Sequence, residues 1–341
     1  MTSKPCPGGA RSADPILLIQ LKRIGDVLLC TPLARALKVD RPDRRVLFLT
    51  EEANRPILEG NTRIDRVLTV PSSMGLSAWR TVVLELRSES AATVVDLSGT
   101  PRSCLLALAS RAPCKIGFRV RLPRRLVYDI AVVPDRSKYT VDRRLDLLRA
   151  LGIPGAGLEP ELALREAERA EARELLDRAG FDRASALLAV APASRRAKKR
   201  WDPRGFAAVL ERARAQWGAV PLLLWGPGEE GQVNEVLSLL DPPPPRLPGP
   251  PGLRMLAALI EASQLLLTND GGAKHLAVAL GIPSVTVFVS TATFSWHPPG
   301  LPDHIAVEAG GGLADEIERT AAAVAQLWDR AALRPRTGQT A

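Results

Sequence analysis

Six small or polar residues at the start of one predicted helix form the pattern of a phosphate site. The segment 265–288 reads as a buried strand, a tight loop, an amphipathic helix and a second buried strand. Its loop and first helical turn carry Asn269, Asp270, Gly271, Gly272, Lys274 and His275. Glycines let the backbone approach a ligand, and the first N–H groups of a helix have no partners of their own. Because such a helix start attracts phosphate, we predict a site for a phosphorylated ligand at the carboxyl end of a parallel strand.

A candidate base lies near the N-terminus, where Gly25 and Asp26 stand between an apolar run and a helical pattern. Asp26 would then lie at the carboxyl edge of a sheet. It could also be a helix-capping aspartate, because aspartate is common at that position. A helix start favours the ionised carboxylate, which is available but weakly basic. A catalytic role therefore requires that the site raise its basicity or position it closely.

Two more segments of the second half could contact a nucleotide. The stretch 192–201, PASRRAKKRW, follows a predicted strand and carries Lys198 and Lys199. A solvated charge run is one interpretation, but the position after a strand favours phosphate binding. In WGPGEE at 225–230, a glycine turn precedes Glu229 and Glu230, either of which could accept hydrogen bonds from ribose hydroxyls.

The composition of the chain limits which classes of partner and cofactor we expect. A net charge of +9 suggests an anionic partner, but aromatic residues make up only 4% and no basic run is interleaved with them, so we expect no nucleic acid. The four cysteines form no CxxC pair and there are three histidines, so we expect reduced thiols, no metal and no cofactor. No apolar run is long enough to span a membrane and the N-terminus lacks the apolar core of a secretion signal, so we expect a cytoplasmic protein.

Short apolar runs alternate with helical patterns along the whole chain, which predicts an α/β protein with parallel sheets. The expected strands are 16–21, 46–50, 84–87, 93–97, 115–118 and 130–133, followed by 187–191, 221–225, 265–268 and 284–289. The expected helices include 27–38, 102–110, 166–179 and 314–330, and the proline-rich stretch 241–252 cannot be helical. We predict two Rossmann-like domains facing a central cleft. The expected boundaries are a flexible leader 1–14, an N-terminal domain 15–152, a linker 153–160, a C-terminal domain 161–330 and a tail 331–341.

Taken in order, these motifs resemble glycosyltransferase family 9, the ADP-heptose:lipopolysaccharide heptosyltransferases. The resemblance covers about 16–328 and rests on KRIGDVL at 22–28, EGNTRIDRV at 59–67, the segment 94–118, KRWDPRGF at 199–206, WGPGEE and NDGGAKHL at 269–276. It implies a GT-B fold, with the acceptor bound by the N-terminal domain and the nucleotide sugar by the C-terminal one. It also implies inversion without a metal, with an ADP-sugar as substrate.

The resemblance assigns roles to individual residues. Asp26 matches the aspartate proposed as general base, and Lys199 matches the lysine that contacts the donor diphosphate. The donor-phosphate loop and the ribose-binding acid match Asp270, Gly271, Gly272, His275 and either Glu230 or Glu229, with Lys198, Asn269 and Lys274 beside them. Candidate acceptor contacts are Lys22, Arg23, Arg119 and Arg121, the last two in RVRLPRR at 119–125. That cluster could bind an anionic acceptor at a membrane surface. Alternatively, it is a surface loop whose arginines have no binding role.

Three departures from the sequence pattern of the family leave the identity of the donor sugar undetermined. Gly271 stands where the family commonly has Ser or Thr, and Lys274 stands where the family commonly has an apolar residue. The segment 289–298 lacks the usual Gly-Pro-Thr-Asp start, although Thr291 and Thr293 could do similar work.

The leading hypothesis is an inverting, metal-independent glycosyltransferase that moves heptose from ADP-heptose onto a lipopolysaccharide core or related glycan. We expect a monomer with an anionic glycolipid or oligosaccharide acceptor and a peripheral contact with the cytoplasmic face of the inner membrane. The alternatives are another GT-B sugar-nucleotide enzyme, such as an epimerase, or a degenerate nucleotide-sugar-binding protein. An NAD-dependent dehydrogenase is disfavoured because no GxGxxG follows an early strand.

Overall fold

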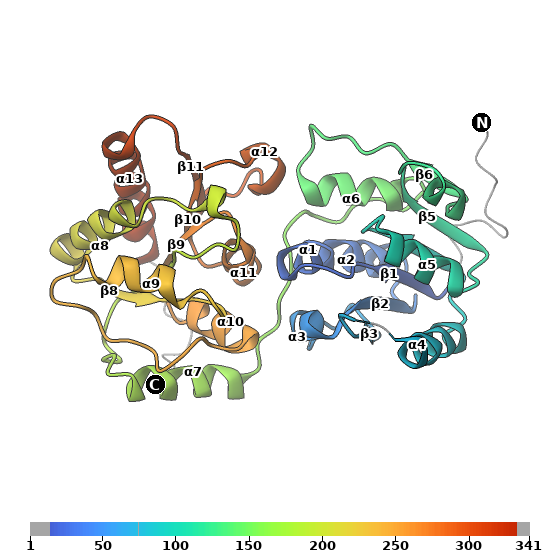
Figure 1. Cartoon of the computed structure of the whole chain (residues 1–341), viewed down its shortest axis with the longest axis horizontal. Helices are drawn as coiled ribbons and strands as arrows, with labels where there is room; N and C mark the ends of the chain where they lie inside the picture. The colour runs from blue at the N-terminus through green and yellow to red at the C-terminus, as the bar shows by residue number, and fades with distance from the viewer. Residues whose placement is uncertain (1–13, 74, 333–341) are drawn as a thin grey trace. The chain divides into compact units, whose positions relative to one another are not determined.

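Two parallel sheets, one in each half of the chain, organise the computed structural model, which describes residues 14–73 and 75–332 (Figure 1). The chain divides into a first unit that ends at Leu162 and a second that begins at Ala163. The expected leader up to residue 13 and the expected tail beyond residue 332 lie outside the described residues.

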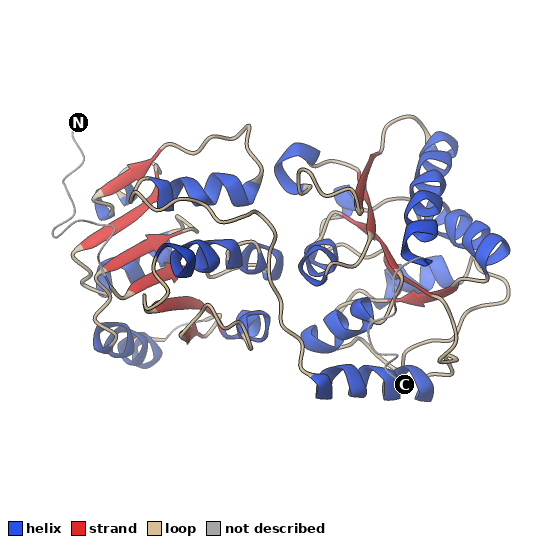
Figure 2. Cartoon of the chain, turned by 180° about the vertical axis from the view of Figure 1, so that it is seen from behind, coloured by secondary structure: helices blue, strands red, loops and turns tan. Residues whose placement is uncertain are grey.

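The first unit is a six-stranded parallel sheet with helices on both faces (Figure 2). Its strands are β1 (Ile16–Ile19), β2 (Val46–Glu51), β3 (Arg66–Val70), β4 (Thr93–Asp96), β5 (Cys114–Phe118) and β6 (Ile130–Val132). Its helices are α1 (Ile24–Leu28), α2 (Thr31–Asp40), α3 (Arg55–Leu58), α4 (Leu76–Ser88), α5 (Pro101–Ala109) and α6 (Thr140–Arg149), with 3-10 turns η1 (Glu52–Asn54) and η2 (Arg124–Val127). The strand order is β3-β2-β1-β4-β5-β6, as in dinucleotide-binding Rossmann folds.

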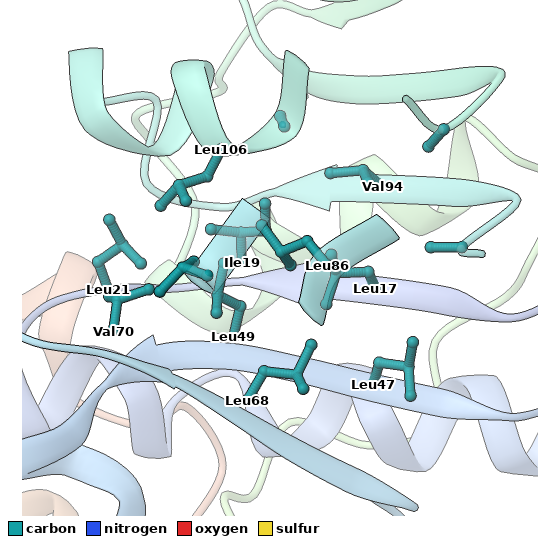
Figure 3. Close-up of a cluster of buried hydrophobic side chains, with 14 residues drawn as sticks. Leu17, Ile19, Leu21, Leu47, Leu49, Leu68, Val70, Leu86, Val94 and Leu106 are labelled. Carbon is teal, nitrogen blue, oxygen red and sulfur yellow. The ribbon is translucent and has the colours of Figure 1, made fainter. Parts of the chain in front are cut away.

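Alternate residues of the central strands build the core on one face of this sheet. Leu17 and Ile19 of β1 point to the same side, because successive side chains of a strand alternate between faces. Figure 3 shows them packed with residues of β2, β3 and β4, and with Leu86 of α4 and Leu106 of α5. Every residue of β1, β2 and β4 is buried, as expected where helices cover both faces.

The second unit repeats the architecture with five parallel strands. They are β7 (Leu187–Ala191), β8 (Val220–Leu223), β9 (Leu265–Asn269), β10 (Ser284–Phe288) and β11 (His304–Glu308). Its helices are α7 (Glu166–Arg178), α8 (Pro203–Trp217), α9 (Glu230–Leu237), α10 (Leu253–Glu261), α11 (Gly272–Leu280), α12 (Thr293–Trp296) and α13 (Leu313–Ala332), with the 3-10 turn η3 (Ala197–Lys199). The order β11-β10-β9-β7-β8 places β7 and β9 side by side, although their connections leave in opposite directions.

Local signals explain where the helices beside the site begin and end. The Asp202 carboxylate accepts a hydrogen bond from the Arg204 N–H, and Pro203 occupies the first position of α8. Proline suits that position because the N–H it lacks would have no helical partner. Gly218 and Gly281 end α8 and α11 with φ of 63° and 68°, which glycine adopts without strain.

The predicted α/β class and most predicted elements are confirmed, but two expectations are wrong and two strands were not predicted. The predicted strand 84–87 is wrong, because it lies within α4, whose buried Val82, Val83 and Leu86 follow helical spacing. Strands β3 and β11 were not predicted, since both are partly exposed and lack a continuous apolar run. Cys30 and Cys104 are free and buried, whereas Cys114 is disulfide-bonded, so the expectation of reduced thiols is wrong there.

The predicted linker 153–160 lies in the first unit and is fastened to α2. The Arg35 guanidinium donates to the carbonyl oxygens of Ala156 and Glu159, at 2.6 and 2.9 Å, and to Glu161 Oε1 at 2.9 Å. The Glu161 N–H donates to Thr31 Oγ1 at 2.8 Å. No helix in the described part of the chain is long and apolar enough to cross a membrane.

Candidate functional site

The neighbouring strands β7 and β9 place two polar loops at one edge of the second sheet. Ala191 pairs with Thr268, so the chain leaves both strands at the same level. Ligands of open α/β sheets bind at such a point, where adjacent strands connect in opposite directions. Asn269 fastens the two loops together, since its Oδ1 accepts from the Trp201 N–H at 2.9 Å and its Nδ2 donates to the Pro192 oxygen at 2.5 Å. The side chain of Asn269 is buried, and its role here is to hold the loops.

Asp270 lies at the centre of a charged cluster that includes two of the three lysines predicted near the diphosphate, Lys199 and Lys274. Its Oδ2 is 2.6 Å from Lys199 Nζ and its Oδ1 is 2.7 Å from Lys274 Nζ. The Thr291 hydroxyl also donates to Oδ2 at 2.8 Å. Lys199 belongs to the loop after β7 and lies 71 residues before Asp270, whereas Lys274 belongs to α11, so the carboxylate joins two distant segments. The cluster holds two ammonium groups for one carboxylate.

Burial and charge act against each other in this cluster. Burial alone would raise the pKa of Asp270, but the charge of Lys274 and the hydrogen bonds from both lysines hold that pKa well below its ordinary value. Burial lowers the pKa of the Lys274 ammonium to about 8, although Asp270 acts in the opposite direction. Asp270 is therefore ionised at neutral pH and Lys274 is mostly charged.

Lys274 is a buried residue, with 1% of its side chain exposed. Besides Asp270, its ammonium donates to the carbonyl oxygen of Trp296 at 3.0 Å and lies 4.7 Å from the centre of the Phe288 ring. It therefore connects α11 to α12 and to the end of β10. The His275 ring, also buried, lies 6.2 Å from the ring of Trp296.

The start of α11 leaves room for a ligand. Gly271 is the N-cap residue and makes no side-chain capping bond, and Gly272 begins the helix. A Cβ added at Gly271 would come no closer than 3.8 Å to the Asn269 oxygen. Glycine is therefore not required by packing at this position, and its small size leaves the backbone N–H groups of the first turn open to an anion.

The two candidate ribose-binding acids are in different environments. Glu229 is half-buried, and its Oε2 accepts from the Gly226 N–H at 2.9 Å, which closes the glycine turn. Glu230 is exposed and forms an ion pair with Arg246 at 2.6 Å. Lys198 lies beside Lys199 in η3 but is exposed. The structure thus gathers Lys199, Asp270, Gly271, Gly272 and Lys274 at the start of α11, whereas the two glutamates lie at the start of α9.

In the first unit, Asp26 lies within α1, whose N-cap residue is Arg23. It is therefore not a capping residue. Arg144 of α6 holds it: Nη2 is 2.6 Å from Asp26 Oδ1, and Nη1 donates to the Asp26 carbonyl oxygen at 2.8 Å. The arginine is buried, whereas the carboxylate is partly exposed. Asp26 follows β1, which neighbours β4 where the strand order reverses, so it too lies at a switch point.

Arg144 was missed by sequence reasoning, although a signal was present. In α6 it lies on the same helical face as Val141, Leu145 and Leu148, all of which are buried. A charged residue on a buried face needs a partner, because an unpaired buried charge is costly. The partner is 118 residues earlier in the chain, which the local pattern does not reveal.

The predicted acceptor residues are exposed and spread over two loops. Lys22 Nζ lies 3.5 Å from Glu51 Oε1, and Arg102 Nη1 is 2.9 Å from the same oxygen. Arg119 and Arg121 lie beyond β5, in the loop that leads to η2. In the described residues, no three His, Cys, Asp or Glu side chains are grouped so as to hold a metal ion.

Comparison with known proteins connects this geometry to a family. The model of glycosyltransferase family 9 (heptosyltransferase) matches residues 79–309, more than half of the chain. Lipopolysaccharide heptosyltransferase 3 of Escherichia coli is 25% identical to this chain over 285 residues, which are 80% of this chain and 83% of that protein.

Solved structures share the fold. The family 9 glycosyltransferase of Veillonella parvula superposes with a TM-score of 0.83 at 22% identity, over 93% of this chain and 98% of that one. The E. coli heptosyltransferase WaaC, solved with ADP, has a TM-score of 0.73 at 20% identity, over 93% and 99%. These likenesses confirm the fold of two Rossmann-like units, and the family match gives the enzyme class. The chain therefore belongs to glycosyltransferase family 9 and is a glycosyltransferase.

Proposed function

We propose that this enzyme transfers heptose from ADP-heptose to a sugar hydroxyl of a lipopolysaccharide core, with inversion and without a metal. The observation that carries the donor half is the Lys199–Asp270–Lys274 cluster at the start of α11. Similarity to a heptosyltransferase solved with ADP, and to lipopolysaccharide heptosyltransferase 3, supports the donor and the acceptor class.

The donor half must stabilise a leaving diphosphate. As the glycosidic bond breaks, negative charge grows on the phosphate oxygens and must be met by fixed positive charge. Two lysines and one aspartate leave a net charge of +1, and the N-terminus of α11 adds its backbone N–H groups. These groups of the protein stabilise the leaving diphosphate. The ribose of the donor is bound by either Glu229 or Glu230.

The acceptor half uses Asp26 as the general base. Inversion in one displacement needs a base that takes the proton of the attacking hydroxyl. Arg144 engages Oδ1, which leaves Oδ2 for that hydroxyl and fixes the plane of the carboxylate. Lys22 and Arg23, beside Asp26 in the chain, would bind anionic groups of the acceptor.

A surface of the first unit fits a lipid-linked acceptor. Leu105 and Leu108 of α5 are both 55% exposed, and Leu122 before η2 and Leu126 within it are 71% and 78% exposed. Helix α5 packs against η2, so these four leucines lie on or next to two neighbouring elements. Residues 101–111 and 119–127 contain six arginines, Arg119 and Arg121 among them, and no acidic residue. We call the four leucines with Arg119 and Arg121 the leucine–arginine surface, and propose that it touches anionic lipid at the cytoplasmic face of the inner membrane.

Replacing the base tests the proposal. Asp26→Asn should lower heptose transfer to a core-deficient lipopolysaccharide by about a thousandfold. Its ADP affinity should stay unchanged, because Asp26 lies outside the second unit. Asp43→Asn, an exposed aspartate of the same unit, is the matched control.

Transfer is measured by mass spectrometry of the product and ADP binding by calorimetry. Full activity of Asp26→Asn would refute the assignment of the base. Turnover of ADP-heptose without any acceptor would instead favour the epimerase-like alternative. The anomeric configuration of the product, read by NMR, tests inversion, and activity in a chelator tests independence from metal.

A further inference from the structure

Two ammonium groups contact the same carboxylate at the start of α11, but only one of them is accessible. Lys274 and Asp270 have 1% and 3% of their side chains exposed, whereas Lys199 has 15%. Lys199 also belongs to a short 3-10 turn in a loop, while Lys274 lies in the first turn of a nine-residue helix. A ligand arriving at the helix start therefore reaches Lys199.

The contacts of Lys274 hold it in place. One hydrogen bond goes to Asp270 Oδ1, another goes to the carbonyl oxygen of Trp296, and the ammonium lies against the face of the Phe288 ring. Removing the positive charge would leave Asp270, a buried carboxylate, with Lys199 as its remaining cation. Since leaving a buried charge unpaired is strongly unfavourable, Lys199 would then be held on Asp270.

An anion site with a buried carboxylate gains from a second cation, because a single lysine paired with that carboxylate leaves no net positive charge for a diphosphate. We propose that Lys274 is the counter-ion of Asp270 and thereby releases Lys199 to bind the diphosphate of the donor. The inference rests on the proposed function and adds a role for a buried residue that does not touch the donor. Lys274 is thus a positioning residue, and it acts through Asp270 and Lys199.

A double-mutant cycle with ADP as the probe isolates this role. Lys274→Met keeps the length of the side chain without its charge, and Asp270→Asn removes the charge that needs a counter-ion. In the native background, Lys274→Met should weaken ADP binding by about tenfold or more, because Lys199 stays on Asp270. In the Asp270→Asn background, the same change should alter ADP affinity by less than about threefold, because no carboxylate remains to hold Lys199.

Matched controls separate charge pairing from general damage. Lys38 is 15% exposed, like Lys199, and lies 2.8 Å from Asp65 in the first unit. Lys38→Met should leave ADP affinity unchanged. If the Lys274→Met variant does not fold, the double variant with Asp270→Asn still tests the inference. The inference requires that this double variant fold and bind ADP as Asp270→Asn does. A folded double variant that no longer binds ADP would overturn the inference.

The outcomes distinguish failure of the inference from failure of the proposed function. If Lys199→Met leaves ADP affinity unchanged, the donor site lies elsewhere and the proposed function fails at that point. A different outcome would overturn only the inference. If Lys199→Met weakens ADP binding, the donor site stands. If Lys274→Met then lowers ADP affinity by the same factor in the native and the Asp270→Asn backgrounds, the counter-ion role is wrong.

Discussion

At the scale of single residues, the charged side chains of the site act in pairs whose partners are distant in sequence. Asp26 could be picked out from its place after the first strand, but Arg144, which orients it, could not be assigned to it from the sequence. Lys274 was predicted to supply charge near the phosphates, yet its burial and its bond to the Trp296 oxygen depend on how α12 packs. A motif reports residue types, whereas a partner is set by tertiary packing.

The lowered pKa of Lys274 predicts that ADP binding weakens with rising pH. Burial brings this pKa to about 8, below the ordinary 10.5, so the ammonium loses its proton as pH rises through about 8. Without that charge, Asp270 competes for Lys199, and ADP affinity should fall by about tenfold between pH 7.5 and 9.5. Calorimetric titration of ADP across this range measures the effect.

Asp270 and His297, which both lie near Lys274, do not titrate in this window. Asp270 stays ionised, and His297, whose pKa burial and the charge of Lys274 lower from 6.5, is already neutral. The second ionisation of a phosphate lies near pH 6, so ADP keeps its charge. Lys274→Met should abolish the pH dependence, and a variant that retained the full slope would show that another group is responsible.

At the scale of elements, the buried strands could be predicted and the exposed ones could not. Strand β7 was predicted with the bounds it has, because it is a continuous apolar run between breakers. Strands β3 and β11 include exposed residues, and α4 presents Leu84 to solvent, which disguised its helical period. The loops after β7 and β9 could be assigned to one site from the sequence, because parallel strands end at one edge of a sheet. The hydrogen bonds of Asn269 that join the two loops could not be predicted.

The element around η2 predicts binding to anionic membranes. Leu122→Ser with Leu126→Ser should lower the fraction of enzyme bound to vesicles containing anionic lipid by about fivefold, because two apolar contacts are lost from the leucine–arginine surface. Cosedimentation with vesicles of phosphatidylethanolamine and phosphatidylglycerol measures this fraction. Val39→Ser with Leu239→Ser, which removes exposed apolar residues outside that surface, should bind as the native enzyme does. Equal loss in both variants would contradict a specific docking surface.

At the scale of the whole molecule, the proposed chemistry is divided between two units that each have their own parallel sheet and core. The contacts of the proposed donor site, from Lys199 to Trp296, lie within the second unit, and the pair Asp26–Arg144 lies within the first. The alternation of strands and helices predicted this two-sheet architecture from sequence. The strand orders could not be read from it, because order is a property of tertiary pairing.

This division predicts that the second unit alone retains the donor site. A chain of residues 163–332 is within the usual size of a domain and should fold independently. It should bind ADP within about threefold of the affinity of the full chain, since all the described contacts of the cluster are internal to it. It should transfer no heptose, because Asp26 is absent. Calorimetry with ADP and circular dichroism test this, with Lys199→Met in the same fragment as control. If the folded fragment binds ADP no better than that control, residues of the first unit must contribute to the donor site.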